Sequence, residues 1–394
     1  MLSTLVAPLV LAPGLAQDAV LQVPFAYSQD DLGNQEAAMT YFETRYYNNE
    51  NRWSLGQKDL ADAVAMARLA FEEQSLALGA AQVLYLYAWF TRAGDIMRDN
   101  IALSAQLFEI SINYAGCSRD LPTEYWLQLG CDIRFGQPAI LYAWLQETEP
   151  SGSAVTSIYR ERATQLLEYL KTVPRFADAG KTWSSPWDMN FNQLRYPDIP
   201  AKPIWNASKV PLAVFLEENY GTFRSELEGI INAVDVEDGY EAIRRADVSV
   251  ESLSTPGGWD AIRIVRYGDW NEAFCSFAPK TCALLKTRKE LVNCPYVNTN
   301  YYKLFPGAHL KPHFGNAPRL TAHLAVIAPE PLRSGISVGP AQSLWIEGKS
   351  MVIDDTYPHS VSHWGQHPRY VLATWFCHPC DENHDSGQVC AESL

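Results

Sequence analysis

The sequence predicts an α+β protein, in which a helical N-terminal region precedes a β-rich domain. Apolar residues recur at helical spacing from about residue 35 to 172, whereas short alternating strands follow about residue 258. Between them, prolines and tryptophans crowd residues 174–205. Helices repeat their buried face about every 3.6 residues and strands every two, so the change of period separates two regions.

The helical region shows apolar residues on one face of each predicted helix. Two such faces are formed by Leu60, Val64, Ala67 and Phe71, and by Ala163, Leu166, Leu167 and Leu170. Residues 80–90 are apolar all round, which favours a central helix. Antiparallel pairs of the tetratricopeptide kind and a plain bundle both remain open, because no clean 34-residue repeat is present.

Prolines stop helices and favour extended connections, so we place the domain junction in residues 174–205. The predicted organisation is a signal peptide (1–16), a helical region (17–173), a linker and domain start (174–205), a β-rich domain (193–380) and a cysteine-containing tail (381–394). One further helix is expected after the linker. It would carry Leu212, Phe215, Leu216, Phe223, Leu227, Ile230 and Ile231.

Six short segments after residue 258 alternate or are continuously apolar. They are RIVRYGDW, YYKLF, TAHLAVIA, SLWIE, SMVIDD and RYVLATWF. Turns rich in Pro, Gly and Asp separate them, which is typical of a sandwich or barrel. A jelly roll, with two facing sheets, is the form that closes most strand edges.

Composition excludes several classes of protein. Hydrophobic residues make up 47% and charged residues 19% of the 394, which indicates a globular rather than a disordered chain. The net charge of −14 argues against a general nucleic-acid surface and against docking on anionic lipid. The oligomeric state is not indicated.

The first residues, MLSTLVAPLVLAPGLA, predict location in the secretory pathway. The apolar run has the length of a signal-peptide core and ends in small residues, although a positive start is absent. An ordinary buried segment is the alternative. The run is too short for a membrane span, and we expect no such span in the mature chain.

Eight cysteines fit that compartment, because an even count in a secretory chain favours disulfides. Asn206-Ala-Ser208 is a possible glycosylation sequon. The tail offers an alternative, since cysteines and histidines could bind zinc there. These are Cys377, Cys380, Cys390, His378 and His384. Disulfides among the cysteines of this tail and Cys294 are favoured.

His313 and His359 are candidate metal ligands, because each follows a predicted strand of the same domain. Two neutral imidazoles suit Fe(II), Zn or Cu, and a structural role is the alternative for each. Arg369 begins the strand RYVLATWF, ten residues after His359. An arginine that points into an apolar barrel is costly unless it meets an anion, and its planar group binds a carboxylate with two hydrogen bonds. An internal ion pair with Asp354 or Asp355 is the alternative.

Residues 193–380 resemble the aspartyl/asparaginyl β-hydroxylase family of iron and 2-oxoglutarate oxygenases. The resemblance rests on RYPDIPAKPIW, GDWNEAFCSFAPKTC, PGAHLKPHFG, RLTAHL and EGKSMVIDDTYPHSV, in order, with Arg369 following. It implies a double-stranded β-helix, which is a jelly-roll or cupin-like fold. The family often carries a tetratricopeptide-like region before this domain.

The resemblance also implies a cofactor site. Fe(II) would be held by His313 and His359, with Gly315 where many iron oxygenases carry a carboxylate. Arg369 would bind 2-oxoglutarate, and His323 would assist. O2 is the oxidant, and no acid–base catalytic residue is expected beyond the metal centre.

Other residues follow from the same resemblance. Trp259 and Tyr302 would lie by the cosubstrate, although core packing is an equal alternative for Trp259 and Tyr302 replaces a small hydroxyl residue. Cys275 and Cys282 would form a disulfide. Asp354 and Asp355 match a family pair that we interpret as fixing a turn.

The sequence departs from the family pattern on the substrate side. Arg-Leu-Arg-x-His is here Arg319-Leu320-Thr321-Ala322-His323, and Ala261 stands where an amide is expected. Arg319 remains a candidate substrate contact. The expected activity is hydroxylation of an unactivated C–H bond, such as the β-carbon of Asp or Asn in a protein or peptide. The alternatives are a small molecule or biosynthetic peptide as substrate, or an inactive barrel that only binds partners.

Overall fold

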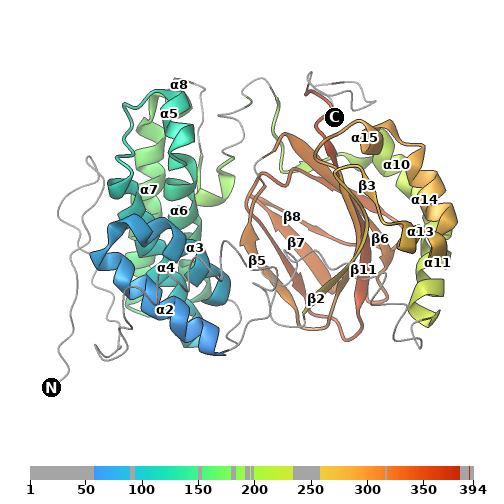
Figure 1. The fold of residues 1–394 in the computed structure, drawn as a ribbon, viewed down its shortest axis with the longest axis horizontal. Coiled ribbons are helices and arrows are strands. Elements are labelled where there is room, and N and C mark those ends of the chain that lie inside the picture. The colour runs from blue at the N-terminus through green and yellow to red at the C-terminus, as the bar shows by residue number, and fades with distance from the viewer. Residues whose placement is uncertain are drawn as a thin grey trace. The chain divides into compact units, whose positions relative to one another are not determined.

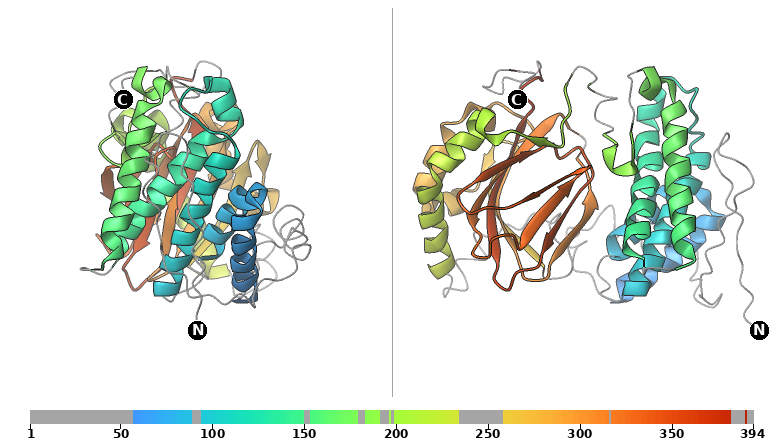
Figure 2. Two further views of the ribbon diagram at one scale, coloured as in Figure 1. Left: turned by 90° about the vertical axis from the view of Figure 1, so that its left-hand side faces the viewer. Right: turned by 180° about the vertical axis from the view of Figure 1, so that it is seen from behind.

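The computed structural model describes residues 57–88, 94–149, 153–178, 183–190, 196, 199–233, 258–315, 317–381 and 390 (Figures 1 and 2). The chain divides between Met189 and Asn190 into two compact units, and each is described by itself. This division lies within residues 174–205, whose role as a linker stays a prediction. The predicted signal peptide and most of the tail after residue 381 lie outside the described residues.

The first unit is helical. Its elements are α2 (Gln57–Glu72), η3 (Gln74–Leu76), α3 (Ala77–Ala88), α4 (Gly94–Tyr114), α5 (Thr123–Gln128), α6 (Cys131–Thr148), α7 (Val155–Thr172), α8 (Pro174–Asp178) and η4 (Pro186–Asp188). α4 packs against α3 and α6, and α6 packs against α7. The predicted helical region is therefore confirmed where it is described. A tetratricopeptide-like repeat is not confirmed, since the lengths of the described α-helices of this unit range from 5 to 21 residues.

Helix α4 is buried on every side from Asn100 to Ile112. The apolar pattern did not single it out, because it carries buried polar residues, Glu109 among them. Glu109 forms an ion pair with Arg162 of α7, and both side chains are 1% exposed. Pairing allows the charges to lie inside the bundle.

The second unit begins with β1 (Ile204–Trp205), η5 (Ala207–Lys209), α10 (Pro211–Glu218) and α11 (Tyr220–Ala233). It continues with β2 (Trp259–Arg266), β3 (Asp269–Trp270), α13 (Glu272–Phe277), α14 (Pro279–Lys286) and α15 (Lys289–Val292). The remaining strands are β4 (Asn298–Leu304), β5 (His309–His313), β6 (Arg319–Ile327), β7 (Ser334–Val338), β8 (Ala341–Leu344), β9 (Ser350–Ile353), β10 (His359–His363) and β11 (Arg369–Cys377).

These strands form two antiparallel sheets. The larger has the order β1-β9-β6-β11-β4-β2-β3 and the smaller β5-β10-β7-β8. From β4 to β11 the chain passes repeatedly between the two sheets, as a double-sheet jelly roll requires. The predicted mixture of helices and antiparallel sheets is therefore confirmed.

Helices cover only the larger sheet, among the elements that are described. α10, α11, α13 and α14 lie along its outer face (Figures 1 and 2). One apolar core fills the space between these helices and the sheet, and a second lies between the two sheets. The inner surface of the jelly roll is thus left to position a site.

One predicted helix is wrong in its extent, because α10 and α11 are separate. The break lies at Asn219, whose side chain donates a hydrogen bond to the carbonyl oxygen of Phe215 at 2.8 Å. An asparagine side chain that bonds the last turn of a helix favours termination there.

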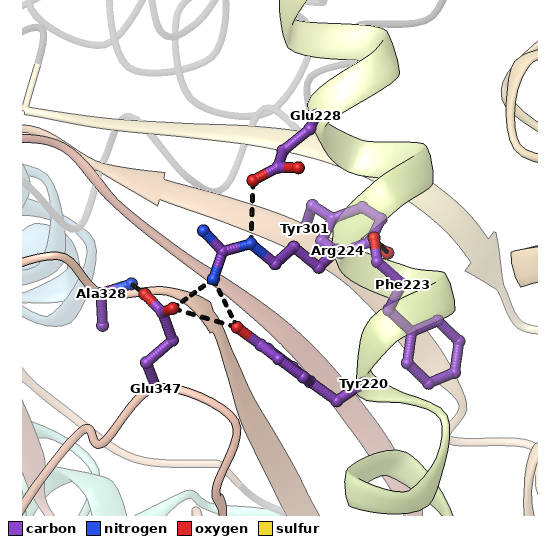
Figure 3. Close-up of polar contacts among 7 residues, drawn as sticks. All are labelled: Tyr220, Phe223, Arg224, Glu228, Tyr301, Ala328 and Glu347. Carbon is purple, nitrogen blue, oxygen red and sulfur yellow. Dashed lines mark hydrogen bonds and ion pairs between the residues drawn. The ribbon is translucent and has the colours of Figure 1, made fainter.

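A polar cluster fastens α11 to the sheet (Figure 3). Arg224 donates to Glu228 at 2.8 Å, donates to Tyr220 at 2.6 Å and pairs with Glu347. The second carboxylate oxygen of Glu347 accepts the backbone N–H of Ala328 at 2.8 Å. The cluster therefore links α11, the end of β6 and the loop before β9.

All eight cysteines form disulfides, namely Cys117–Cys131, Cys275–Cys282, Cys294–Cys377 and Cys380–Cys390. The pair implied by the family resemblance, Cys275–Cys282, is present. The zinc alternative is not supported, because the tail cysteines are already bonded. Among the described helices, none is long and apolar enough to cross a membrane.

Candidate functional site

His313 and His359 lie side by side on neighbouring strands of the smaller sheet, β5 and β10. His313 ends β5, His359 begins β10, and the two are register partners. Their ring centroids are 4.1 Å apart with the planes at 57°. The sequence placed both residues in turns after strands. They instead belong to strands, and that fixes their backbones more firmly.

Hydrogen bonds select the tautomer of both histidines. Nδ1 of His313 lies 2.7 Å from the carbonyl oxygen of Lys311, and Nδ1 of His359 lies 2.8 Å from that of Tyr357. A carbonyl oxygen only accepts, so each Nδ1 carries the proton. Each Nε2 then keeps its lone pair, which is the form that binds a metal.

Burial also keeps these rings neutral. Burial and the neighbouring His359 lower the pKa of His313 well below its usual value. The pKa of His359 is lowered, chiefly by burial. Both effects disfavour the imidazolium, so the pair offers two neutral nitrogen donors at neutral pH.

Gly315 lies against the carboxylate of Asp355. Its N–H donates to the backbone oxygen of Asp355 at 2.7 Å. A Cβ on residue 315 would be 2.8 Å from Oδ1 of Asp355, closer than real Cβ contacts. The absence of a side chain at 315 therefore leaves room for the carboxylate that β9 and its following turn supply.

Asp355 is held on one oxygen and open on the other. Its Oδ2 accepts Nε and Nη2 of Arg319, at 3.0 and 2.8 Å, and Nε1 of Trp375 at 2.7 Å. Its Oδ1 is buried without a partner among the described groups. The turn-fixing interpretation suits Asp354, which accepts the N–H of Thr356 at 3.0 Å, but not Asp355.

Arg369 begins β11 and is 5% exposed. Its Nε donates to Oγ of Ser334 at 3.2 Å, and its Cζ lies 4.0 Å from the ring centroid of Trp345. It forms no ion pair with any described residue, so the predicted alternative partners, Asp354 and Asp355, do not neutralise it. Burial lowers the pKa of Arg369 to about 9, which still leaves it a cation at neutral pH.

His323 belongs to β6 and lies near Arg369. Its ring stacks with Trp345, with centroids 6.1 Å apart and planes at 12°. Burial, then the charge of Arg369, lowers the pKa of His323 to about 3. His323 is therefore neutral, and its buried Nδ1 has no partner within the described structure.

Three aromatic rings form another wall. Tyr302 lies 4.7 Å from Trp259 and 6.0 Å from Trp375, centroid to centroid. The hydroxyl of Tyr302 accepts Nδ2 of Asn300 at 3.0 Å. These rings come from β2, β4 and β11, which are neighbours in the larger sheet.

One cavity brings most of the predicted site residues together. Its walls include Trp259, Tyr302, His313, His323, His359 and Arg369. Arg319 instead lines a neighbouring smaller cavity, so its predicted substrate contact is not brought into the main one.

The donor set of this cavity fits a metal held by two imidazoles. In the described parts of the chain, no three His, Cys, Asp or Glu side chains are grouped so as to hold a metal. Asp355 is near, but Oδ2 is engaged by three donors. The arrangement offers two nitrogen ligands, an uncompensated cation and an aromatic wall.

Sequence reasoning missed Trp345 and Trp375 as cavity residues, and it gave Asp355 a different role. Trp375 carries a signal in hindsight, because its position in β11 has the parity of Arg369. Trp345 has no such signal, since it follows β8 outside regular alternation.

Comparison with known proteins locates the similarity in the second unit. Residues 217–379 match the family model described as aspartyl/asparaginyl beta-hydroxylase. The aspartyl/asparaginyl beta-hydroxylase of Mus musculus is 33% identical over 132 residues, which are 33% of this chain and 17% of that protein. The ornithine lipid ester-linked acyl 2-hydroxylase of Rhizobium tropici is 28% identical over 196 residues, 49% of this chain and 66% of that protein. The chain thus spans less than two thirds of either relative.

A solved structure of a Pseudomonas putida prolyl-4-hydroxylase is also similar. The match covers 40% of this chain and 87% of that one, with 15% identity and a TM-score of 0.27.

Proposed function

The chain belongs to the aspartyl/asparaginyl beta-hydroxylase family through residues 217–379, and from this premise we propose that it is an Fe(II)- and 2-oxoglutarate-dependent hydroxylase. Fe(II) with 2-oxoglutarate and O2 would supply the oxidation of a C–H bond. His313 and His359 would hold the metal through their Nε2 atoms. The two fixed tautomers and the neutral state of both rings support this assignment.

The observation that carries the proposal is Arg369, a buried guanidinium without a carboxylate among the described residues. An isolated buried charge is unfavourable, so a fold that retains one commonly reserves it for an anion. Arg369 lines the same cavity as the two histidines. A dicarboxylate with a 2-oxo acid group at one end could meet both, which is the chemistry of 2-oxoglutarate.

The other residues of the cavity would orient the ligands and exclude water. His323 is neutral and has an unpartnered ring nitrogen, so it can hydrogen-bond a bound carboxylate. Oδ1 of Asp355 lies beside Gly315 and can accept a hydrogen bond from a group near the metal. Trp259, Tyr302 and Trp375 would keep the reacting C–H bond away from bulk solvent.

A titration tests the cofactor assignment without a substrate. Purified protein is mixed anaerobically with Fe(II), and 2-oxoglutarate is added while the visible charge-transfer band of the chelate is followed. We expect a saturable band that is lost in His359→Ala and shifted to higher 2-oxoglutarate concentration in Arg369→Met. Zn(II) in place of Fe(II) is the matched control and should give no band. A wild-type protein without a band would favour the alternative in which the jelly roll only binds partners.

The residues that would contact the substrate help to decide which C–H bond is oxidised. An Asp residue that is oxidised at its β-carbon needs a cation to hold its side-chain carboxylate. Arg319 is the candidate, but two of its nitrogens are bonded to Asp355. The cavity presents Thr321 where a second arginine would lie in the family pattern, and Oγ1 of Thr321 is buried without a described partner.

These contacts favour a second candidate substrate, an uncharged apolar group such as an acyl chain. The Rhizobium tropici relative is named as an acyl 2-hydroxylase, and the aromatic wall of Trp259, Tyr302 and Trp375 suits an apolar chain. Substrate-dependent succinate release separates the two. An acidic peptide and its amide-capped neutral counterpart would be compared with a fatty acyl amide. Stimulation by the acidic peptide alone would return the Asp substrate to first place.

An oxidising compartment is proposed as the site of action. The four disulfides support it, because such bonds persist in the secretory pathway or outside the cell. Fractionation of cells that express the full chain tests it, with protease protection of a lumenal pool as the expected result.

A further inference from the structure

Trp345 touches two of the groups that we assign to the cosubstrate. Cζ of Arg369 lies 4.0 Å from its ring centroid, and the ring of His323 is nearly parallel to it at 6.1 Å. The indole is 3% exposed and lines the cavity. Neither the family resemblance nor the sequence pattern assigns this residue a role.

Trp345 and Ser334 form a single support for Arg369. The backbone N–H of Trp345 donates to the carbonyl oxygen of Ser334 at 3.2 Å. Oγ of Ser334 accepts Nε of Arg369, also at 3.2 Å. The guanidinium is therefore held along its Nε edge by Ser334 and on its face by Trp345.

This support replaces the ion pair that usually orients a buried arginine. A flexible side chain without a carboxylate partner can adopt several rotamers, and each one moves the charge. A cation over a buried indole is attracted by the ring face, and the attraction grows where water is excluded. With Nε bonded to Ser334, the two Nη groups remain for a ligand.

We propose that Trp345 and Ser334 are positioning residues that orient Arg369 and so give the cavity its preference for a dicarboxylate over a monocarboxylate 2-oxo acid. The proposal rests on the proposed function. Both kinds of acid carry the same 2-oxo acid group for the metal. Only the dicarboxylate has a distal carboxylate for Arg369, so its affinity alone depends on the orientation of that side chain.

The test measures two dissociation constants for each variant. Fe(II)-loaded protein is titrated anaerobically with 2-oxoglutarate and, separately, with 2-oxobutyrate, which lacks the distal carboxylate. The readout is the ratio of the two constants. Trp345→Leu should raise the constant for 2-oxoglutarate about 10-fold and leave that for 2-oxobutyrate within about twofold. Trp345→Phe, which restores a ring face, should recover most of the wild-type ratio.

Two further variants keep the test decisive. Ser334→Ala should reduce the ratio about threefold, and it is conservative enough to fold if Trp345→Leu does not. Trp375→Leu is the matched control, because this indole lines the same cavity but lies by Arg319. Its ratio should equal that of the wild type, even where both constants change.

Different failures have different meanings. If the wild type binds 2-oxoglutarate but Trp345→Leu and Ser334→Ala keep its ratio, the positioning role is refuted and the proposed function stands. If Trp345→Phe loses as much as Trp345→Leu, the ring face is not the support, and this inference fails. If the wild type binds neither acid, the proposed function fails and takes the inference with it.

Discussion

Two arginines near the cavity differ in whether a carboxylate neutralises their charge. Arg319 is bonded through two nitrogens to the carboxylate of Asp355, whereas Arg369 meets a hydroxyl and an indole face but no carboxylate among the described residues. Arg319 is 22% exposed in its side chain, and Arg369 as a residue is 5% exposed. The more deeply buried cation is thus the one that lacks a counter-ion.

The contrast separates a structural charge from one kept for a ligand. A paired arginine satisfies its neighbour and stabilises the fold around it, so its removal strands a buried carboxylate. An unpaired buried arginine gives the empty protein little, and a bound anion can compensate its cost. Replacement of Arg319 should therefore lower mainly the stability of the protein, whereas replacement of Arg369 should lower mainly its affinity for the ligand.

The largest effect is expected at Arg369. Arg369→Met should weaken 2-oxoglutarate binding by about 100-fold or more, since about 3 kcal/mol of charged hydrogen bonding is lost. The ligand-free protein should unfold at an equal or higher temperature, because an unpaired buried charge is replaced by an apolar chain. Anaerobic titration and thermal unfolding measure the two effects. A marked loss of stability in the ligand-free variant would mean that Arg369 has a structural partner after all.

Asp354 sharpens the comparison from the acidic side. It lies next to Asp355 in the chain, but it accepts hydrogen bonds from the neutral groups of Asn190 and Thr356. Burial raises its pKa to about 7, against about 3.9 in an unfolded chain. The folded state therefore binds more protons between these values, and stability falls as the pH rises from 4 to 7.

Asp354→Asn should remove this dependence. Its free energy of unfolding, relative to wild type, should increase by about 2 kcal/mol between pH 5 and pH 7. Urea unfolding at pH 5, 6 and 7 measures it, and Asn190→Ala is a control that keeps the carboxyl group. If the difference in the free energy of unfolding between Asp354→Asn and wild type does not change with pH, Asp354 is already ionised at pH 5.

Arg319→Met should act in the opposite sense to Arg369→Met. It leaves the buried Asp355 without its cation and should cost about 1.5 kcal/mol, a reduced figure because Arg319 is partly exposed. Chemical denaturation measures the loss. Arg319→Lys, which keeps the charge but not the two-bond geometry, should lose less. A variant as stable as wild type would remove the distinction between the two arginines.

The smallest effect is expected at Arg224, a third arginine, whose contacts are drawn in Figure 3. Its side chain is 36% exposed and that of Glu347 is 31% exposed. Arg224→Met should cost about 0.5 kcal/mol, because solvent screens exposed pairs. The same denaturation experiment at 0.05 and 0.5 M salt should show the loss shrinking as salt rises. A loss above that of Arg319→Met would reverse the proposed order.

Much of the fold could be predicted because it depends on local pattern. The helical and β regions differ in period, and β6, β9 and β11 carry enough apolar residues to be recognised. β5, β7 and β10 were missed, since HLKPH, SGISV and HSVSH are polar and short. Their inward positions include the two candidate metal ligands. Polar residues of the site thus occupy positions where apolar residues would otherwise indicate a strand.

The sequence by itself determined which residue types the site contains, because His313, His359 and Arg369 stand in motifs with recognisable spacing. Tertiary structure alone decided the partners. Asp355 is 36 residues from Arg319 and Trp345 is 24 from Arg369, and only the folding of the strands and of the turns between them brings each pair together. Charge pairing depends on distances of a few ångströms between strands, which no spacing along the chain encodes. Which arginine is neutralised, and which is left for a ligand, is therefore settled by the packing of the two sheets.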